Sequence, residues 1–139
     1  MGQHMGIDYG SKLAGTTAVA MVKDNQLHLW QSQKGQDADT WLLELIRELM
    51  PKVIYIDAPL TLPSAYYQTP QNPDADFFYR QADREVRAMS PMFIGGLTAR
   101  AMKLRLKLAH EGIAMLETYP SQAAKVLLNN TAKKKALPP

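Results

Sequence analysis

Three short apolar runs in this sequence each end on a carboxylate residue. Asp8 ends MGID, Asp57 ends VIYID and Glu117 ends IAMLE. An unbroken apolar run of this length is typical of a strand that is buried on both faces of a parallel sheet. The C-terminal ends of such strands form the edge at which open α/β folds bind their ligands. We therefore expect the three acids to converge at one edge of a sheet.

Clustered carboxylates repel one another, so a cluster is typical of a site for a hard divalent cation. We predict that Asp8, Asp57 and Glu117 are catalytic and bind Mg²⁺ or Mn²⁺, with Asp8 central. Such ions serve phosphodiester hydrolysis, because they activate a water and neutralise charge on the phosphate oxygens. Three carboxylates favour one tightly held ion and a second ion recruited by the substrate. Each acid taken alone is explained more simply, as a turn former or a helix cap.

Length and composition favour one domain that spans residues 1–139. The chain is 46% hydrophobic, which is enough to bury a core. It contains no cysteine and three scattered histidines, so neither a disulfide framework nor a zinc site is expected. No apolar run approaches the length of a membrane span, and we expect a soluble, cytoplasmic protein without a membrane partner. The net charge of +3 is compatible with an anionic partner such as nucleic acid.

The elements predicted from hydrophobic patterning follow an informative order. Strands are expected at 5–8, 15–22, 27–31, 53–57 and 113–117, with a hairpin turn at Asp24 and Asn25. Helices are expected after Asp37 or Asp39, at about 77–89 and 97–111, and from Pro120. The first three strands form an antiparallel meander, and the fourth lies parallel beside the first. This order predicts an α/β fold of the ribonuclease H-like type, with a mixed five-stranded sheet flanked by helices.

Residues 58–74 form a long irregular segment next to the predicted acid edge. Four prolines interrupt it, and Tyr66 and Tyr67 lie between them. A long ordered loop in this position is more often functional than structural. The two tyrosines can stack on nucleic-acid bases, although packing within the loop explains them equally well.

Three arginines follow this loop at helical spacing. Arg80, Arg84 and Arg87 share one face of the helix expected at 77–89, and guanidinium groups suit phosphate oxygens. They form either a phosphate clamp or surface ion pairs, namely Asp76 with Arg80 and Asp83 with Arg87.

Three further groups of basic residues are candidates for phosphate contacts. Lys12, close to Asp8, can orient a phosphate, although a turn is the simpler interpretation. Arg100, Lys103 and Lys107 also share a helix face, for which a solvated exterior is the simpler interpretation, as it is for Lys133–Lys135.

Four segments of the chain together resemble a known family. GIDYGSK, IDAPLTLP, DREVR followed by MFIGGLTARAMKL, and ETYP resemble domain-of-unknown-function family 429, which is described as predicted ribonuclease H-like nucleases. The resemblance covers about residues 6–125. It implies a divalent-metal nuclease site at Asp8, Asp57 and Glu117. The matching segments also contain Lys12, Asp83, Arg84 and Arg87, which we assign to substrate binding.

The resemblance has one departure. Related sequences continue beyond the ETYP helix into a segment with an Asp-rich motif, and this chain ends at Pro139. The resemblance therefore implies that a fourth acid and a last family helix are missing, and that a homodimer can cover the sheet face left open. Two alternative functions remain: a nucleotide-binding or phosphotransfer protein of the actin-like superfamily, suggested by GIDYGS, and a non-catalytic interaction module.

Overall fold

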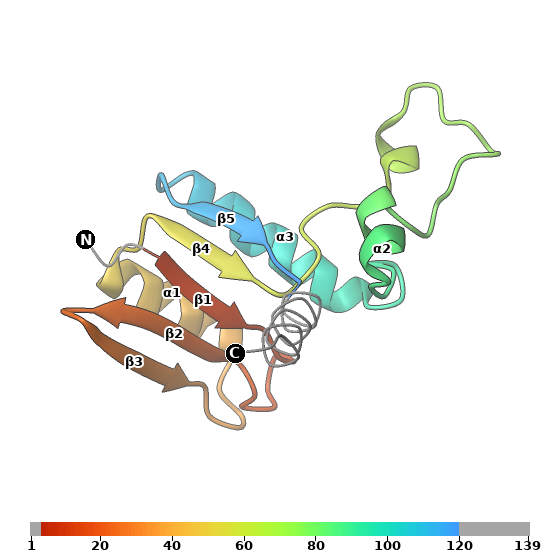
Figure 1. The fold of residues 1–139 in the computed structure, drawn as a ribbon. Helices are drawn as coiled ribbons and strands as arrows, with labels where there is room; N and C mark the ends of the chain where they lie inside the picture. The colour runs from red at the N-terminus through yellow and green to blue at the C-terminus, as the bar shows by residue number, and fades with distance from the viewer. Residues whose placement is uncertain (1–3, 120–139) are drawn as a thin grey trace, which may run out of the picture.

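The computed structural model describes residues 4–119 and shows an α/β fold built on one mixed sheet (Figure 1). The strands are β1 (His4–Asp8), β2 (Ala18–Lys23), β3 (Gln26–Gln31), β4 (Val53–Ile56) and β5 (Ala114–Glu117). The helices are α1 (Ala38–Leu49), the 3₁₀ turn η1 (Ser64–Tyr67), α2 (Gln81–Val86) and α3 (Gly95–Ala109). The helix predicted from Pro120 and the lysines at 133–135 lie outside the described residues. Within residues 4–119, no helix has both the length and the hydrophobicity to cross a membrane.

The sheet has the strand order β3-β2-β1-β4-β5, with β1 at its centre. β1 is antiparallel to β2 and parallel to β4, while β2–β3 is antiparallel and β4–β5 is parallel. This confirms the predicted meander and the parallel pairing of the Asp8 and Asp57 strands. Asp24 and Asn25 both have positive φ, 54° and 63°, as a two-residue hairpin turn that matches the strand twist requires.

The core lies between one face of the sheet and two helices. Met5 and Ile7 of β1 and Ile54 and Ile56 of β4 point into it and are almost fully buried. The helices contribute Leu42 and Ile46 from α1 and Leu104 and Leu108 from α3. Both helices lie behind the sheet in the view of Figure 1.

Local signals in the sequence set the limits of α1. The Asp37 carboxylate accepts hydrogen bonds from the backbone N–H groups of Asp39 and Thr40, which caps the first turn. At the other end Met50 takes a left-handed conformation with φ of 51°, and Pro51 cannot continue the helix.

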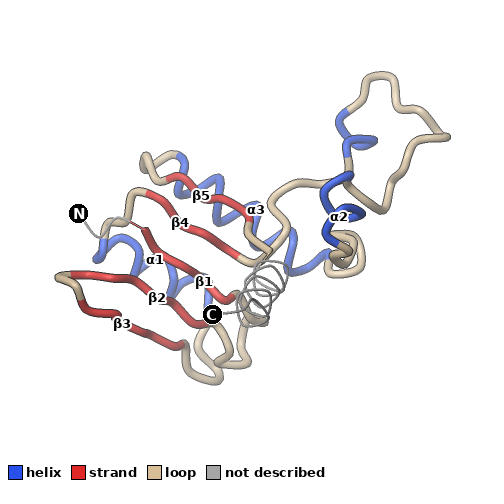
Figure 2. Tube along the Cα trace, viewed as in Figure 1, coloured by secondary structure: helices blue, strands red, loops and turns tan. Residues whose placement is uncertain are grey.

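The segment between β4 and α3 departs from the prediction. Helix α2 covers only residues 81–86, because the chain is already committed to other conformations on both sides. Upstream, the Asp76 side chain accepts the N–H groups of Phe78 and Tyr79 in a local turn. Downstream, Arg87 has φ of 55° and ends the helix. The loop and α2 stand away from the sheet as a protrusion (Figure 2).

Candidate functional site

Asp8 and Asp57 lie side by side at the C-terminal ends of neighbouring parallel strands. The residues before them, Ile7 and Ile56, are partners in the β1–β4 register and face the core. Because side chains alternate along a strand, both carboxylates project from the face opposite the helices. The backbone N–H of Tyr9 donates a 2.7 Å hydrogen bond to Asp57 Oδ1, which fixes one of the two carboxylates.

The pKa of Asp57 depends on its burial and on the neighbouring Asp8 carboxylate. Burial raises the pKa of Asp57 above its usual value, and the Tyr9 N–H opposes this rise. The Asp8 carboxylate, which is close enough to accept a hydrogen bond from a protonated Asp57, raises the pKa further. Two like charges held together in this way favour any cation that can lie between them.

The acid pair opens into a cavity of about 700 Å³ on the face of the sheet opposite α1 and α3. Small residues form much of its lining, and Leu29, Tyr55 and Thr118 surround them; the small residues are Gly6, Ala18 and Ala20. A side chain on Gly6 would meet nothing within 4 Å. The cavity is therefore apolar over most of its surface, with its carboxylates at one end.

Glu117 does not join the acid pair, although it ends the third predicted strand as expected. Its register partner is the buried Ile56, so its side chain projects toward the helix side of the sheet. The residue that directly follows β5, Thr118, faces the side of Asp8 and Asp57 and lines the same cavity. A shift of one position along a strand moves a side chain to the other face.

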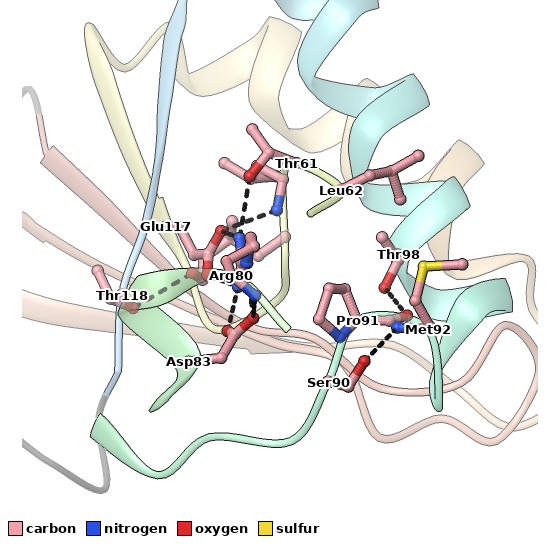
Figure 3. Close-up of polar contacts among 12 residues, drawn as sticks. Thr61, Leu62, Arg80, Asp83, Ser90, Pro91, Met92, Thr98, Glu117 and Thr118 are labelled. Atoms are coloured by element: carbon pink, nitrogen blue, oxygen red, sulfur yellow. Dashed lines mark hydrogen bonds and ion pairs between the residues drawn. The ribbon is translucent and has the colours of Figure 1, made fainter. Parts of the chain in front are cut away.

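Arg80 holds the Glu117 carboxylate (Figure 3). Its Nη1 and Nη2 atoms each lie 2.7 Å from a Glu117 oxygen, and Nη2 also lies 2.7 Å from Asp83 Oδ1. The Leu60 N–H donates a further 2.9 Å bond to Glu117 Oε1. Leu60 lies near the start of the loop and Arg80 lies at its end, directly before α2, so Glu117 fixes the base of the loop to β5.

In this buried cluster one arginine pairs with two carboxylates. Burial on its own would raise the pKa of Glu117, but the hydrogen bonds from Arg80 and from the Leu60 N–H bring it below its usual value. Burial on its own would lower the pKa of Arg80, and the two carboxylates reverse this and raise it. A smaller cavity of about 180 Å³ borders the cluster, and Asp57 lines both this cavity and the larger one.

The residues assigned to substrate binding are found in different surroundings. Asp83 is 1% exposed, and besides its ion pair with Arg80 it accepts the Arg80 backbone N–H at 2.9 Å. Arg84 and Arg87 are exposed, and Arg84 pairs with Asp76 and lies over the Tyr79 ring at 4.7 Å. The predicted pairs Asp76–Arg80 and Asp83–Arg87 do not form, because α2 begins after Arg80 and ends before Arg87.

The two loop tyrosines take part in packing within the protrusion. Tyr66 meets Phe77 edge to face at 5.2 Å, and the Tyr67 hydroxyl accepts the Leu62 N–H at 3.1 Å. This favours the packing interpretation over a role in stacking on bases.

A second polar cluster, which the sequence did not indicate, is formed around Tyr9, the residue that follows Asp8. Arg100 makes two hydrogen bonds to Asp39, of 2.8 and 2.9 Å, and lies over the Tyr9 ring at 4.5 Å. The Tyr9 hydroxyl donates to the same carboxylate at 2.5 Å. Lys12 points to this side as well, 3.5 Å from Asp37. The cluster ties the loop after β1 to α1 and α3, and so positions Asp8.

Within the described residues, no group of three or more His, Cys, Asp or Glu side chains is arranged to hold a metal ion. Asp8 and Asp57 form a pair and not a group of three. No protein-family model matches the chain. No curated protein matches it either.

Proposed function

We propose that this protein is a divalent-metal-dependent hydrolase of phosphodiester bonds, with a ribonuclease H-like fold and nucleic acid as its substrate. One observation carries the proposal: Asp8 and Asp57 are placed together on the central parallel strands. Both carboxylates line one cavity of about 700 Å³, and burial together with Asp8 raises the pKa of Asp57. The element order and the central position of β1 support the fold, and the resemblance to family 429 points to the same class.

The residues present fit one divalent ion better than two. Asp8 and Asp57 supply carboxylate oxygens, the ligands that Mg²⁺ and Mn²⁺ prefer, and a site with two protein carboxylates leaves room for waters, which Mg²⁺ tends to keep. Glu117 is directed away and has both oxygens bonded to Arg80. A bound ion of this kind would activate a water and neutralise charge on phosphate oxygens. The hydrogen bond from the Tyr9 N–H fixes the orientation of the Asp57 carboxylate in this site.

The pairing of Glu117 with Arg80 favours a second candidate function. A carboxylate that serves as a brace for the loop cannot also complete a catalytic cluster in the same conformation. The fold would then carry a non-catalytic interaction module that binds its partner through the protrusion.

Metal titration separates the two candidates. We expect calorimetry to show Mn²⁺ binding to the wild-type protein, and binding to be lost in Asp8→Asn and in Asp57→Asn. Without metal, Asp8→Asn should also raise the free energy of unfolding at pH 7 by about 0.5–2 kcal/mol, because it removes a like-charge repulsion. Glu117→Gln is the matched control, since it removes a carboxylate of the same edge that faces the other side.

The outcomes are distinct. Loss of Mn²⁺ binding in Asp8→Asn but not in Glu117→Gln supports the two-acid site. Equal Mn²⁺ binding in the wild type and Asp8→Asn would refute the site and favour the interaction module. Cleavage tested on DNA, RNA, hybrid and junction substrates, each with and without Mn²⁺, then identifies the substrate.

A further inference from the structure

The surface of α3 carries a concentration of positive charge. Between Gly95 and His110 the sequence contains four basic residues and no acidic one: Arg100, Lys103, Arg105 and Lys107. The net charge of this one helix therefore exceeds the +3 of the whole chain. A basic stripe along one helix is the typical electrostatic mark of a surface that meets phosphate groups.

Three of these residues line a pocket between α3 and the start of α1. The pocket has a volume of about 160 Å³ and is lined by Arg100, Lys103 and Lys107, with Lys12 from the loop after β1. Asp37 and Asp39 also line it. Four cations and two carboxylates leave the pocket with a net charge of +2.

The two carboxylates are already paired with other groups. Asp39 binds Arg100 through two hydrogen bonds, and Asp37 lies 3.5 Å from Lys12. Among residues 4–119, no carboxylate lies within ion-pair distance of Lys103 or Lys107. These two ammonium groups, one helical turn apart on the same face, are the unmatched charges of the pocket.

The α1 N-terminus is not the source of the binding capacity. Its first free amides are used within the protein, because Ala38 N–H donates to the Lys12 carbonyl and the N–H groups of Asp39 and Thr40 donate to Asp37. An anion in the pocket would therefore bind to lysine side chains.

We propose that this pocket binds a phosphate group. A phosphate fits the volume, and its negative charge offsets the excess of two positive charges. The pocket lies at the same end of the sheet as the acid pair, because Arg100 Nη1 donates to the carbonyl of Gly10, two residues beyond Asp8. The phosphate belongs either to a nucleic-acid backbone or to a free phosphate monoester. Phosphate binding in this pocket requires neither a bound metal ion nor hydrolysis.

The test uses the full chain and a double variant, Lys103→Gln with Lys107→Gln. The matched control is Lys23→Gln with Lys52→Gln, which removes two exposed lysines at the other end of the sheet. One arm measures the change in melting temperature with inorganic phosphate, relative to sodium chloride of equal ionic strength. The other arm measures binding of a fluorescent single-stranded oligonucleotide between 0.05 and about 1 M salt, because phosphate contacts make affinity depend on salt.

If the ligand is a backbone phosphate, the double variant should bind the oligonucleotide with a salt slope shallower by about one unit. This corresponds to affinity about tenfold weaker at 0.1 M salt, and the control should keep the wild-type slope. If the ligand is a free phosphate monoester, the double variant alone should lose the rise in melting temperature. Restoring the charge with Lys103→Arg and Lys107→Arg should recover either signal.

Equal behaviour of the double variant and the control in both arms would overturn the proposal. This failure is distinguishable from failure of the proposed function, since Asp8→Asn should lose Mn²⁺ binding and keep phosphate binding.

Discussion

The Arg80 side chain makes more hydrogen bonds than any other side chain of the candidate site. Its side chain is 12% exposed and lies between Glu117, at 15%, and Asp83, which is fully buried. Removing one partner of a buried ion pair leaves an uncompensated charge, and this costs more than the pair contributes as a whole. The cluster should therefore be sensitive to the loss of the arginine.

We expect Arg80→Met to lower the free energy of unfolding by about 3 kcal/mol, because two carboxylates then remain buried without a cation. Chemical denaturation at pH 7 measures the change. Arg84→Met is the matched control: Arg84 is 62% exposed and pairs only at the surface, so its loss should have a small effect. Equal destabilisation by the two variants would show that the Arg80 cluster does not support the fold.

The same cluster predicts a dependence of stability on pH. Because the hydrogen bonds from Arg80 hold the pKa of Glu117 below its usual value of 4.5, the folded state binds a proton there less readily than the unfolded chain. The stability that Glu117 contributes is therefore complete above about pH 5 and is lost as the pH falls through the folded-state pKa. The stability difference between wild type and Glu117→Gln should be largest at pH 7 and shrink toward pH 3. A difference that stays constant over this range would contradict the assignment.

The position of Glu117 also shows what the sequence could and could not predict about the site. The apolar runs correctly placed Asp8 and Asp57 at the ends of neighbouring strands. Their runs alternate so that Ile7 and Ile56 are buried and the following acid is not. In IAMLE the buried residues are Ile113 and Met115, so the same alternation puts Glu117 on the core side. That signal was present, but the large Leu116 next to Glu117 obscured it.

At the scale of elements, the sequence predicted best where a local signal was strong. The Asp37 cap of α1 and the Asp24–Asn25 turn each act within a few residues. The protrusion was harder to predict, because contacts between distant residues determine its shape. Arg80 was expected on the face of a helix, whereas its pairing with Glu117, 37 residues away, holds it before the helix starts.

The role of Arg84 in α2, and of Arg87 directly after it, remains a prediction about substrate binding. If the protrusion contacts nucleic acid, Arg84→Ala and Arg87→Ala should each weaken binding of an oligonucleotide and reduce its salt slope by about one unit. Mn²⁺ affinity should stay nearly unchanged, since both residues lie outside the acid pair. The Asp76 partner of Arg84 gives a surface-pair alternative, in which neither variant changes the slope.

At the scale of the whole molecule, residues 4–119 cover the two faces of the sheet unequally. Helices α1 and α3 pack on one face, while the other carries apolar residues that remain exposed even beside the 700 Å³ cavity. Leu27 and Leu29 of β3 are 63% and 71% exposed, and Val22 of β2, paired with Leu27, is 54% exposed. β3 is also an edge strand of the sheet, with no proline or charged residue from Gln26 to Gln31. Edge strands of this kind are prone to pair with another chain.

This arrangement predicts self-association through the corner formed by β2 and β3. A second copy that buries about 800 Å² on each partner would cover Val22, Leu27 and Leu29 and satisfy the open edge. Light scattering should give a mass of twice the 15.5 kDa chain, and Leu29→Lys should reduce it to that of one chain. Leu106→Lys is the matched control, because Leu106 is 63% exposed on α3, away from this corner. If the wild type and both variants all have the mass of one chain, the exposed leucines of β3 do not form an interface between copies. The monomer is then the unit in which the acid pair and the lysine pocket act.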